Sequence, residues 1–284
     1  MDVDTVTEND LASMMVGRNV AFKVDKEDIE PGDVVLDVKD LHCLDYRGVE
    51  IVKGLDLQVR KGEIVGIAGI DGNGQTELVE VITGLRKGTS GQVFVNGTDV
   101  FNKPPRFGYD HGVSSIPADR QKHGLVLSFS IEDNLILQNF GDEPFSKKNI
   151  LNRDEIFKYA TKSIEQFDIR PGNSEKRAAG TLSGGNQQKV IIAREVQNDK
   201  DLLIAVNPTR GLDVGAIEYV HRYIVGQRNK GKAVLLVSFE LDEVMSLSDR
   251  IDVIFDGKIV SSIPGKDANE NELGLMMAGG GNKQ

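Results

Sequence analysis

Short hydrophobic runs recur along the chain, each about as long as a buried strand. The run at 63–68 leads into a glycine-rich turn and then into a segment with helical periodicity. The apolar positions expected on one face of that helix are Leu78, Val81, Ile82 and Leu85. Two more runs, 202–206 and 233–237, each follow an apparent helix, as strands of a parallel sheet do. The pattern predicts an α/β core on a parallel sheet.

A second set of strands is separated by turn signals instead of helices, which favours an antiparallel sheet. Its expected members are 34–44, 49–59 and 92–95, with turns at Arg47-Gly48 and Asn96-Gly97. Residues 128–180 are richer in helical and charged character, with breaks at Pro144 and Pro171-Gly172. We therefore expect an antiparallel β subdomain and an α-helical lobe, at about 118–180, in addition to the core.

A repeat joins the two ends of the chain. Residues 8–17, ENDLASMMVG, read like residues 270–279, ENELGLMMAG, with a double methionine in register. The match suggests that an earlier copy of the same domain ended near Gly17, although two short amphipathic segments could also agree by coincidence. Residues 18–33 are polar and acidic and read as a linker. We expect a preceding domain's tail plus linker at 1–33, a domain at 34–279 and a tail at 280–284.

Composition excludes several classes of function. Of the 284 residues 39% are hydrophobic, so a full core can form, and the net charge of −10 repels a nucleic-acid backbone. With no basic patch visible, we expect no nucleic-acid partner. The N-terminus carries acidic residues where a signal peptide carries basic ones, and no apolar run is long enough to cross a membrane. We expect any membrane role to be that of a peripheral subunit.

Cysteine and histidine give no sign of a metal site. The single cysteine, Cys43, cannot form an internal disulfide, which fits a reducing cytoplasm. The four histidines, His42, His111, His123 and His221, lack metal-ligand spacing. The adjacent pair His42-Cys43 ends an apparent strand, where ordinary packing explains it, and we expect no metal there.

The turn after the first core strand has the layout of a phosphate-binding loop. It reads GIDGNGQT and matches G-x-x-x-x-G-K-[ST] except that Gln75 replaces the lysine. Backbone N–H groups could still face phosphate oxygens, and Thr76 could still hold Mg²⁺ weakly. The candidate cofactor-binding residues here are Gly69, Gly72, Asn73, Gly74, Gln75, Thr76 and Glu77. By itself the loop is weak evidence, because glycine-rich turns also occur for steric reasons.

A more specific motif, LSGGNQQK, begins at Leu182. Ser183 is placed to cap the following helix, and paired glycines let the backbone approach a ligand closely. The residues expected to act are Leu182, Ser183, Gly184, Gly185, Asn186 and Gln187. A plain capped helix is the alternative, but the position between a degenerate phosphate loop and a buried strand argues against it.

At this point the chain resembles the ABC ATPase family over residues 34–279. That family has a P-loop (RecA-like) core with antiparallel β and α-helical subdomains, and it binds ATP and Mg²⁺ between one domain's phosphate loop and its partner's LSGGQ-like signature. The segment VNPTRGLD starting at Val206 resembles the family's D-E-P-T-x-x-L-D. The resemblance makes Gly211, Leu212 and Asp213 the D-loop, the turn that closes this motif.

The resemblance also shows what is missing. Val206 replaces a Mg²⁺-binding carboxylate, Asn207 replaces the base that activates water, and Phe239 replaces the switch histidine. With Gln75, these substitutions remove charge, metal ligand and base from one site, so no catalytic residue is intact. Ala118 stands where the family has a lid-loop Gln or Glu. Tyr46 stands where the family stacks an aromatic ring on adenine, although a surface tyrosine on an edge strand is equally consistent.

This combination resembles the second half of tandem importer ATPases for monosaccharides and nucleosides. It implies an upstream ABC half in the same native chain, transmembrane permease subunits, indirectly an external solute-binding protein, and a place on the cytoplasmic face of the membrane. The signature would then complete the upstream half's ATP site, and the isolated half would be weak or inactive as an ATPase. A structural partner that binds no nucleotide, or a tandem ABC protein without a transport role, remains an alternative. A P-loop kinase or GTPase is rejected because the lysine and an acidic Mg²⁺ ligand are missing.

Overall fold

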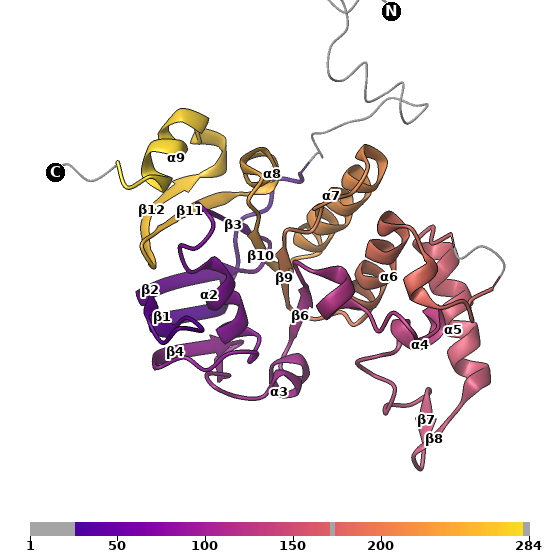
Figure 1. Ribbon diagram of the computed structural model, residues 1–284. Coiled ribbons are helices and arrows are strands. Elements are labelled where there is room, and N and C mark those ends of the chain that lie inside the picture. Colours follow the sequence, from indigo (N-terminus) through magenta and orange to yellow (C-terminus); the bar gives the residue numbers. More distant parts are fainter. Residues whose placement is uncertain (1–25, 171–173, 281–284) are drawn as a thin grey trace, which may run out of the picture. The chain divides into compact units, whose positions relative to one another are not determined.

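The computed structural model describes residues 26–170 and 174–280, which fall into two compact units (Figure 1). The sheet unit comprises the described residues 26–115, 200–207 and 221–280. The helical unit comprises the described residues 116–170, 174–199 and 208–220. Residues 8–17, the first copy of the end repeat, lie outside the described residues.

The main sheet has the strand order β12-β11-β3-β10-β9-β6. Its strands are β3 (Ile64–Ala68), β6 (Val113–Ile116), β9 (Leu202–Val206), β10 (Ala233–Val237), β11 (Arg250–Phe255) and β12 (Lys258–Pro264). β10 pairs in parallel with β3 and β9, and β11 pairs in parallel with β3, whereas β12 is antiparallel to β11. Val237 lies opposite both Ile67 and Val206, so three strands end at the same edge. The residues that follow them are therefore brought together.

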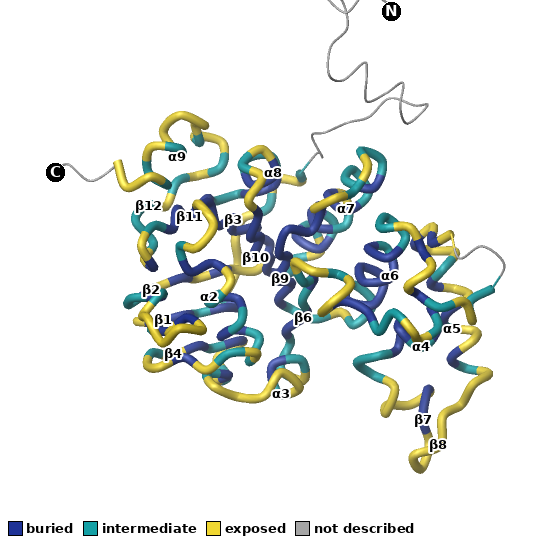
Figure 2. The backbone as a smooth tube through the Cα atoms, in the orientation of Figure 1, coloured by how far each residue is buried: buried dark blue, intermediate teal, exposed yellow. Residues whose placement is uncertain are grey.

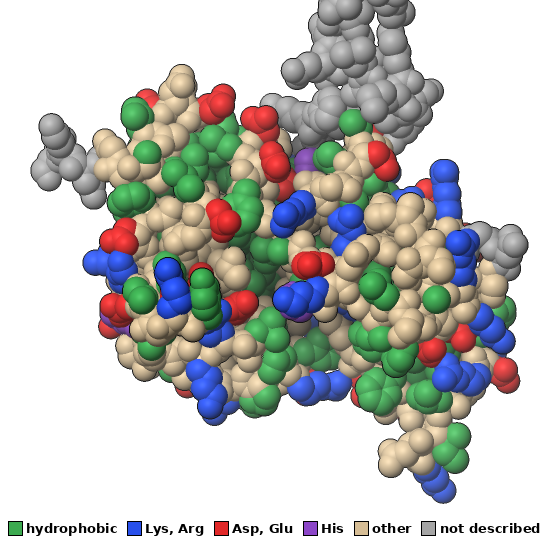
Figure 3. Space-filling view, in the orientation of Figure 1, with side chains coloured by type: hydrophobic (Ala, Val, Ile, Leu, Met, Phe, Trp, Pro, Cys, Tyr) green, Lys and Arg blue, Asp and Glu red, His purple; other side chains and the backbone are tan. Residues whose placement is uncertain are grey.

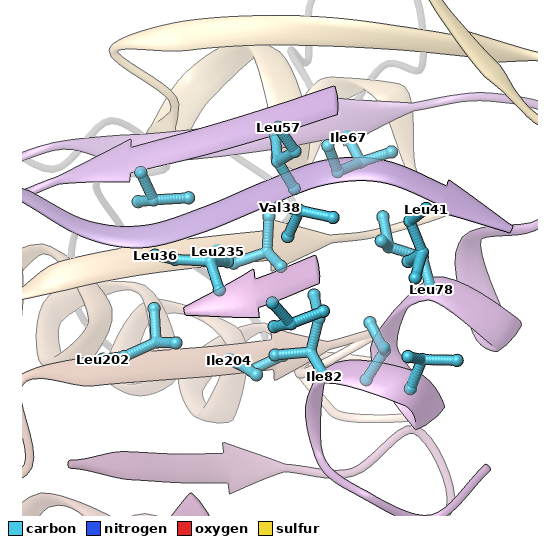
Figure 4. Packing of buried hydrophobic residues seen from close by; sticks show 14 of the residues in the cluster. Leu36, Val38, Leu41, Leu57, Ile67, Leu78, Ile82, Leu202, Ile204 and Leu235 are labelled. Atoms are coloured by element: carbon cyan, nitrogen blue, oxygen red, sulfur yellow. The ribbon is translucent and has the colours of Figure 1, made fainter. Parts of the chain in front are cut away.

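A second, antiparallel sheet has the order β2-β1-β4-β5. Its strands are β1 (Val34–Leu44), β2 (Glu50–Arg60), β4 (Ser90–Val95) and β5 (Thr98–Asp99). These strands confirm the expected antiparallel segments to within two residues at each boundary. The two sheets and helix α2 (Gln75–Ile82) share one hydrophobic core. In Figure 4, Leu36 lies beside Leu235, Leu57 beside Ile67, and Leu41 beside Leu78 of α2. The predicted α/β class with a parallel core is confirmed.

Helix α2 is shorter than its apolar periodicity predicts. Leu78, Val81 and Ile82 are buried as expected, but the helix ends at Ile82 and Leu85 is 67% exposed. The stop is at Gly84, whose φ of +75° is left-handed and whose missing Cβ leaves room for the Lys103 carbonyl. Placing Leu85 on the buried face was therefore wrong.

The other helices of the sheet unit are α3 (Pro105–Asp110), α8 (Leu241–Leu247) and α9 (Glu270–Met277), and α7 (Val214–Asn229) contributes its residues from His221 onward. The repeat's second copy forms α9, whose Leu273 is buried with Ile251 and Val253 of β11. Residues 26–33, which we expected to be linker, are part of this unit. Lys26, for example, donates to the Ser248 carbonyl at 2.8 Å.

The helical unit contains α4 (Ile131–Leu135), α5 (Arg153–Gln166) and α6 (Gly184–Gln197). It also contains the hairpin of β7 (Ser146–Lys147) and β8 (Ile150–Leu151) and two short turns, η2 (Arg120–Gly124) and η3 (Ala179–Thr181). Figure 2 shows that the tip of the hairpin is exposed, whereas β9 and β10 of the other unit are buried. The expected lobe at about 118–180 is thus part of a larger unit that includes α6.

Surface charge is mixed on the face drawn in Figure 3, where basic and acidic side chains are interspersed. Within the described residues, no helix combines the length and the apolar composition that a membrane-crossing segment needs.

Candidate functional site

The loop between β3 and α2 has the backbone of a phosphate-binding turn. Gly72 and Gly74 adopt φ values of +88° and +103°, a region that side-chain-bearing residues rarely enter. Gly74 precedes α2, and no side chain caps this helix. The first N–H groups of α2 therefore point out of the helix without a side-chain acceptor, as an anion site requires.

Asn73 fixes this loop to the turn between β11 and β12. Its Nδ2 donates to the Ile70 carbonyl at 2.9 Å, and its Oδ1 accepts from the Asp256 N–H at 2.7 Å. The Asn73 carbonyl accepts from the Gly257 N–H at 3.2 Å, and Lys53 pairs with Asp256. These hydrogen bonds fix the loop to the β11–β12 turn.

Gln75 is turned into the loop. It is only 3% exposed, and its Nε2 donates to the Ile70 carbonyl at 3.2 Å. A Cβ at Gly69 would lie 2.6 Å from that nitrogen, so Gly69 leaves the space that the amide occupies. The position that we predicted to lack charge therefore carries a neutral amide engaged within the loop itself.

At the neighbouring strand ends, the missing carboxylates are replaced by structural contacts. Val206 is buried in the core, and the Oδ1 of Asn207 accepts a hydrogen bond from the Phe239 N–H at 3.0 Å. The Asn207 N–H in turn donates to the Val237 carbonyl at 2.7 Å, so Asn207 ties β9 to the end of β10. Within residues 26–170 and 174–280, no three His, Cys, Asp or Glu side chains are grouped to hold a metal ion.

A shallow cavity of about 370 Å³ lies beside the loop in the sheet unit. It is lined by Ala68, Gly69, Ile70, Asp71, Ser238, Phe239, Leu241 and Met277. Phe239 is 42% exposed there, and its ring offers neither a donor nor an acceptor. Thr76 and Asp71 are exposed and Glu77 is half-buried. The structure therefore brings together the loop, Asn207 and Phe239, and it leaves Thr76, the predicted weak Mg²⁺ ligand, exposed at the start of α2.

Tyr46 lies in the turn between β1 and β2 and is 86% exposed, beside the Arg47 guanidinium. The turn is shaped by Asp45, whose carboxylate accepts from the Val49 N–H at 2.9 Å, and these bonds hold the pKa of Asp45 below its usual range. The exposed ring is available for stacking on a base or for contact with solvent.

Neighbouring His42 and Cys43 are accounted for by packing. Cys43 is fully buried, and desolvation raises the pKa of its thiol to about 11. His42 contacts Glu50 at 2.7 Å, which raises the pKa of the imidazole. An unreactive thiol and a carboxylate-paired imidazole are consistent with structural roles.

In the helical unit, the signature motif opens α6 as expected. Ser183 caps the helix, since its Oγ accepts from the Asn186 N–H at 3.5 Å and from Asn186 Nδ2 at 3.0 Å. Gln188 reaches the Pro208 carbonyl at 2.7 Å, and Leu182 is buried. The predicted N-cap is confirmed, and Gly184 and Gly185 form the first turn of the helix.

The predicted D-loop lies in the same unit. Gly211 has a φ of +66°, and the Leu212 N–H donates to the Thr209 carbonyl at 3.1 Å to close the turn. The Asp213 carboxylate accepts from the Ala216 N–H at 3.0 Å, at the start of α7. A Cβ at Gly185 would lie 3.3 Å from the Ala216 Cβ, so the signature and D-loop are close neighbours within this unit.

Sequence reasoning missed Arg120. Its Nη1 donates to the Arg210 carbonyl at 2.7 Å, and a Cβ at Gly184 would lie 2.8 Å from its Nη2. Ala118, two residues earlier, is exposed. The only signal in the sequence was the position of Arg120 shortly after Ala118, which does not reveal contact with residues so far along the chain.

Comparison with known proteins gives consistent matches. Residues 52–210 match the ABC transporter family. The chain is 51% identical over 284 residues to the guanosine import ATP-binding protein NupO of Bacillus subtilis, covering 100% of this chain and 56% of that protein. It is 46% identical over 277 residues to the glucose import ATP-binding protein TsgD13 of Haloferax volcanii, covering 97% and 50%.

A solved structure of MJ1267, an ATP-binding cassette of an ABC transporter, superposes with a TM-score of 0.71 at 25% identity, covering 88% of this chain and 100% of that one. The chain spans about half the length of the curated relatives above. With more than half of its residues inside the family match, the chain belongs to the ABC transporter family.

Proposed function

We propose that this chain is the second ATP-binding half of a tandem ABC importer ATPase. Its signature would complete an ATP site whose phosphate loop belongs to the upstream half, while its own site stays degenerate. The observation that carries the proposal is the contrast between the two motif sets. The capped signature helix keeps both glycines and its serine, whereas the loop side has a neutral amide at Gln75 and structural contacts at Asn207.

The residues fit a nucleotide at this half's own site only in part. The left-handed glycines and uncapped α2 suit phosphate oxygens, and Tyr46 is exposed for a base. Mg²⁺ fits poorly, because Thr76 has no carboxylate partner at Val206 or Asn207. We therefore infer that this site holds ATP weakly and does not hydrolyse it. A bound Mg²⁺ would supply charge neutralisation of the phosphates, which these residues do not replace.

At the composite site, this half's contribution is positioning and electrostatics. Ser183 fixes the first turn of α6, so that the N–H groups of Gly184 and Gly185 and the positive end of the helix face a terminal phosphate. Glycines there permit close approach of the backbone. The general base and metal ligands would come from the upstream half.

The proposed cargo is a nucleoside or a simple sugar. Support comes from the names of two relatives: NupO is a guanosine import ATP-binding protein and TsgD13 is a glucose import ATP-binding protein. The partners would be permease subunits, reached through the helical lobe at the cytoplasmic face of the membrane, and indirectly an external solute-binding protein. Cysteines placed in the exposed hairpin, for example at Ile150, should cross-link to the permease in the assembled transporter. Cross-links confined to the upstream half would contradict this placement.

The test of the proposal compares two substitutions in the tandem protein. Gly184→Asp puts a carboxylate at the start of α6, where it repels a terminal phosphate, and should nearly abolish ATP hydrolysis and uptake. Gln75→Ala removes only an amide from the degenerate loop and should have a much smaller effect. Both variants must first be shown to fold and to assemble with the permease. Equal damage from the two would refute the division of labour.

The second candidate is a structural partner that binds no nucleotide, favoured by the internal engagement of Gln75. Titration of this chain with a fluorescent ATP analogue separates the two candidates. Saturable binding that unlabelled ATP displaces supports a nucleotide-holding half. No binding at millimolar concentration supports the structural partner.

A further inference from the structure

We propose that Arg120 is a phosphate-recognition residue of the signature, contributing a positive charge to the terminal phosphate of the nucleotide that the upstream half holds. The inference rests on the proposed function and adds a residue to that composite site. It comes from an arginine near the start of α6 that has no carboxylate partner among residues 26–170 and 174–280.

The guanidinium of Arg120 lies between two glycines of different motifs. Its Nη1 donates to the Arg210 carbonyl at 2.7 Å. A Cβ at Gly184 would lie 2.8 Å from Nη2, and a Cβ at Gly211 would lie 3.8 Å from the same atom. A side chain at Gly184 would therefore displace the guanidinium from the position it occupies in this structure.

The charge of Arg120 has no carboxylate partner in the part of the chain that the structure describes. Among the described residues, no carboxylate oxygen lies within 4.0 Å of its guanidinium, and its Nε–H is buried without an acceptor. The adjacent carboxylate of Asp119 is used by the N–H groups of Gln121 and Lys122, each at 3.0 Å, which hold the pKa of Asp119 below its usual range. A guanidinium that is partly removed from water, with one of its five donors engaged, is stabilised by an anion.

The groups around Arg120 favour a phosphate as the ligand. Helix α6 has 14 residues, and its positive end and first N–H groups converge with Arg120 at Gly184. Arginine binds phosphate oxygens through two parallel N–H donors, and charge-assisted bonds of this kind are about twice as strong as neutral ones. Arg120 would therefore distinguish a nucleoside triphosphate, whose terminal phosphate reaches it, from a diphosphate.

The turn that carries Arg120 is fixed to helix α6. Asp119 caps the turn Arg120–Gly124, and Gln121 Nε2 donates to Gln187 Oε1 of α6 at 3.4 Å. Gly124 packs so closely on α6 that a Cβ there would lie 2.5 Å from Ile191 Cδ1. The guanidinium thus needs no rearrangement of its own turn to meet a ligand at the signature.

The experiment uses the tandem protein with Arg120→Ala, Arg120→Lys and a control, Arg153→Ala, which removes an exposed arginine paired with Asp133 in the same unit. Affinities for ATP and ADP are measured by competition against a fluorescent ATP analogue without Mg²⁺, and kcat and KM are measured with Mg²⁺. We expect Arg120→Ala to lower kcat/KM about 10- to 100-fold and to weaken ATP binding about 10-fold with little change for ADP. Arg120→Lys should recover part of both effects, and the control should match the unsubstituted protein.

A residue that only stabilises the D-loop through Arg210 would change ATP and ADP affinity equally, and that result would overturn the proposal. So would a kcat/KM for Arg120→Ala within twofold of the control. If Arg120→Ala fails to fold, the ADP-to-ATP affinity ratio of Arg120→Lys decides, and an unchanged ratio counts against the proposal. Gly184→Asp separates the two hypotheses: if it is inactive while Arg120→Ala is normal, only this inference fails, whereas normal activity in Gly184→Asp refutes the proposed function itself.

Discussion

Replacing Gln75 by lysine restores the charge that the phosphate loop lacks, and the structure defines what should follow. The Gln75 amide makes one neutral hydrogen bond, to the Ile70 carbonyl, in a place that is 3% exposed. A hydrogen bond to a charged group contributes about 1.5–3 kcal/mol against about 0.5–1.5 kcal/mol for a neutral one. The difference, about 1–1.5 kcal/mol, corresponds to roughly tenfold tighter binding of ATP.

The same substitution should weaken the protein when no nucleotide is bound. An ammonium group at this buried position loses hydration that one carbonyl does not fully replace, which costs about 1–3 kcal/mol of unfolding free energy. Saturating ATP should recover about 1.4 kcal/mol more in the variant than in the unsubstituted chain, because tenfold tighter binding adds RT ln 10. For a protein of this size that is about 3 °C in Tm.

The assay is a titration of each protein with a fluorescent ATP analogue, together with thermal unfolding at several ATP concentrations. Gln58→Lys is the matched control. Gln58 is exposed on β2 and donates to Asp37 at 2.9 Å, and its replacement by lysine adds the same charge outside the loop. An unchanged dissociation constant for Gln75→Lys, or an equal change in the control, would refute the argument that local charge limits binding.

Three further outcomes are expected. With Val206 and Asn207 providing no carboxylate, EDTA should change ATP binding by this chain less than twofold in the same titration, and a larger loss would indicate a metal ligand elsewhere. Leu36→Ala leaves a cavity in the shared core and should lower the unfolding free energy by about 2–5 kcal/mol in urea. Asp168→Asn should lower it by less than about 1 kcal/mol at pH 7, because the carboxylate bonded to Lys189 is 62% exposed. That hydrogen bond lowers the pKa of Asp168 from 3.8, so the stabilisation exists above pH 3.8 and should disappear as the pH falls through the lowered folded-state value.

Hydrophobic pattern predicted β9 and β10 of the main sheet because both strands are buried along their whole length, whereas β6, β11 and β12 were not predicted. Every residue of β9 and β10 is buried, and both strands have the predicted bounds. The helix after the phosphate loop was extended to Leu85 because the apolar spacing continues past the stop at Gly84. A glycine in a helical pattern is ambiguous in sequence, and here the nearby Lys103 carbonyl decides its conformation.

Motif comparison predicts which chemical groups of the family are replaced in this chain, but not what the replacing side chains contact. Gln75 bonds within its own loop, which local spacing could have suggested. Asn207 bonds to the Phe239 N–H, 32 residues away, and Arg120 bonds to the Arg210 carbonyl, 90 residues away. Such contacts depend on which strand ends and turns the fold brings together, so no pattern along a single segment contains them.

The contacts and backbone of Asn207 oppose its replacement by glutamate. Its φ is +43°, a left-handed value that asparagine tolerates better than glutamate does. A glutamate at this position would be strained by about 1–3 kcal/mol. Its longer side chain would also have to accept the Phe239 N–H in a different geometry. Val206 would remain in the core, still without a charge for the metal. Placing a base and a metal ligand at these strand ends would therefore need several simultaneous changes, each unfavourable alone.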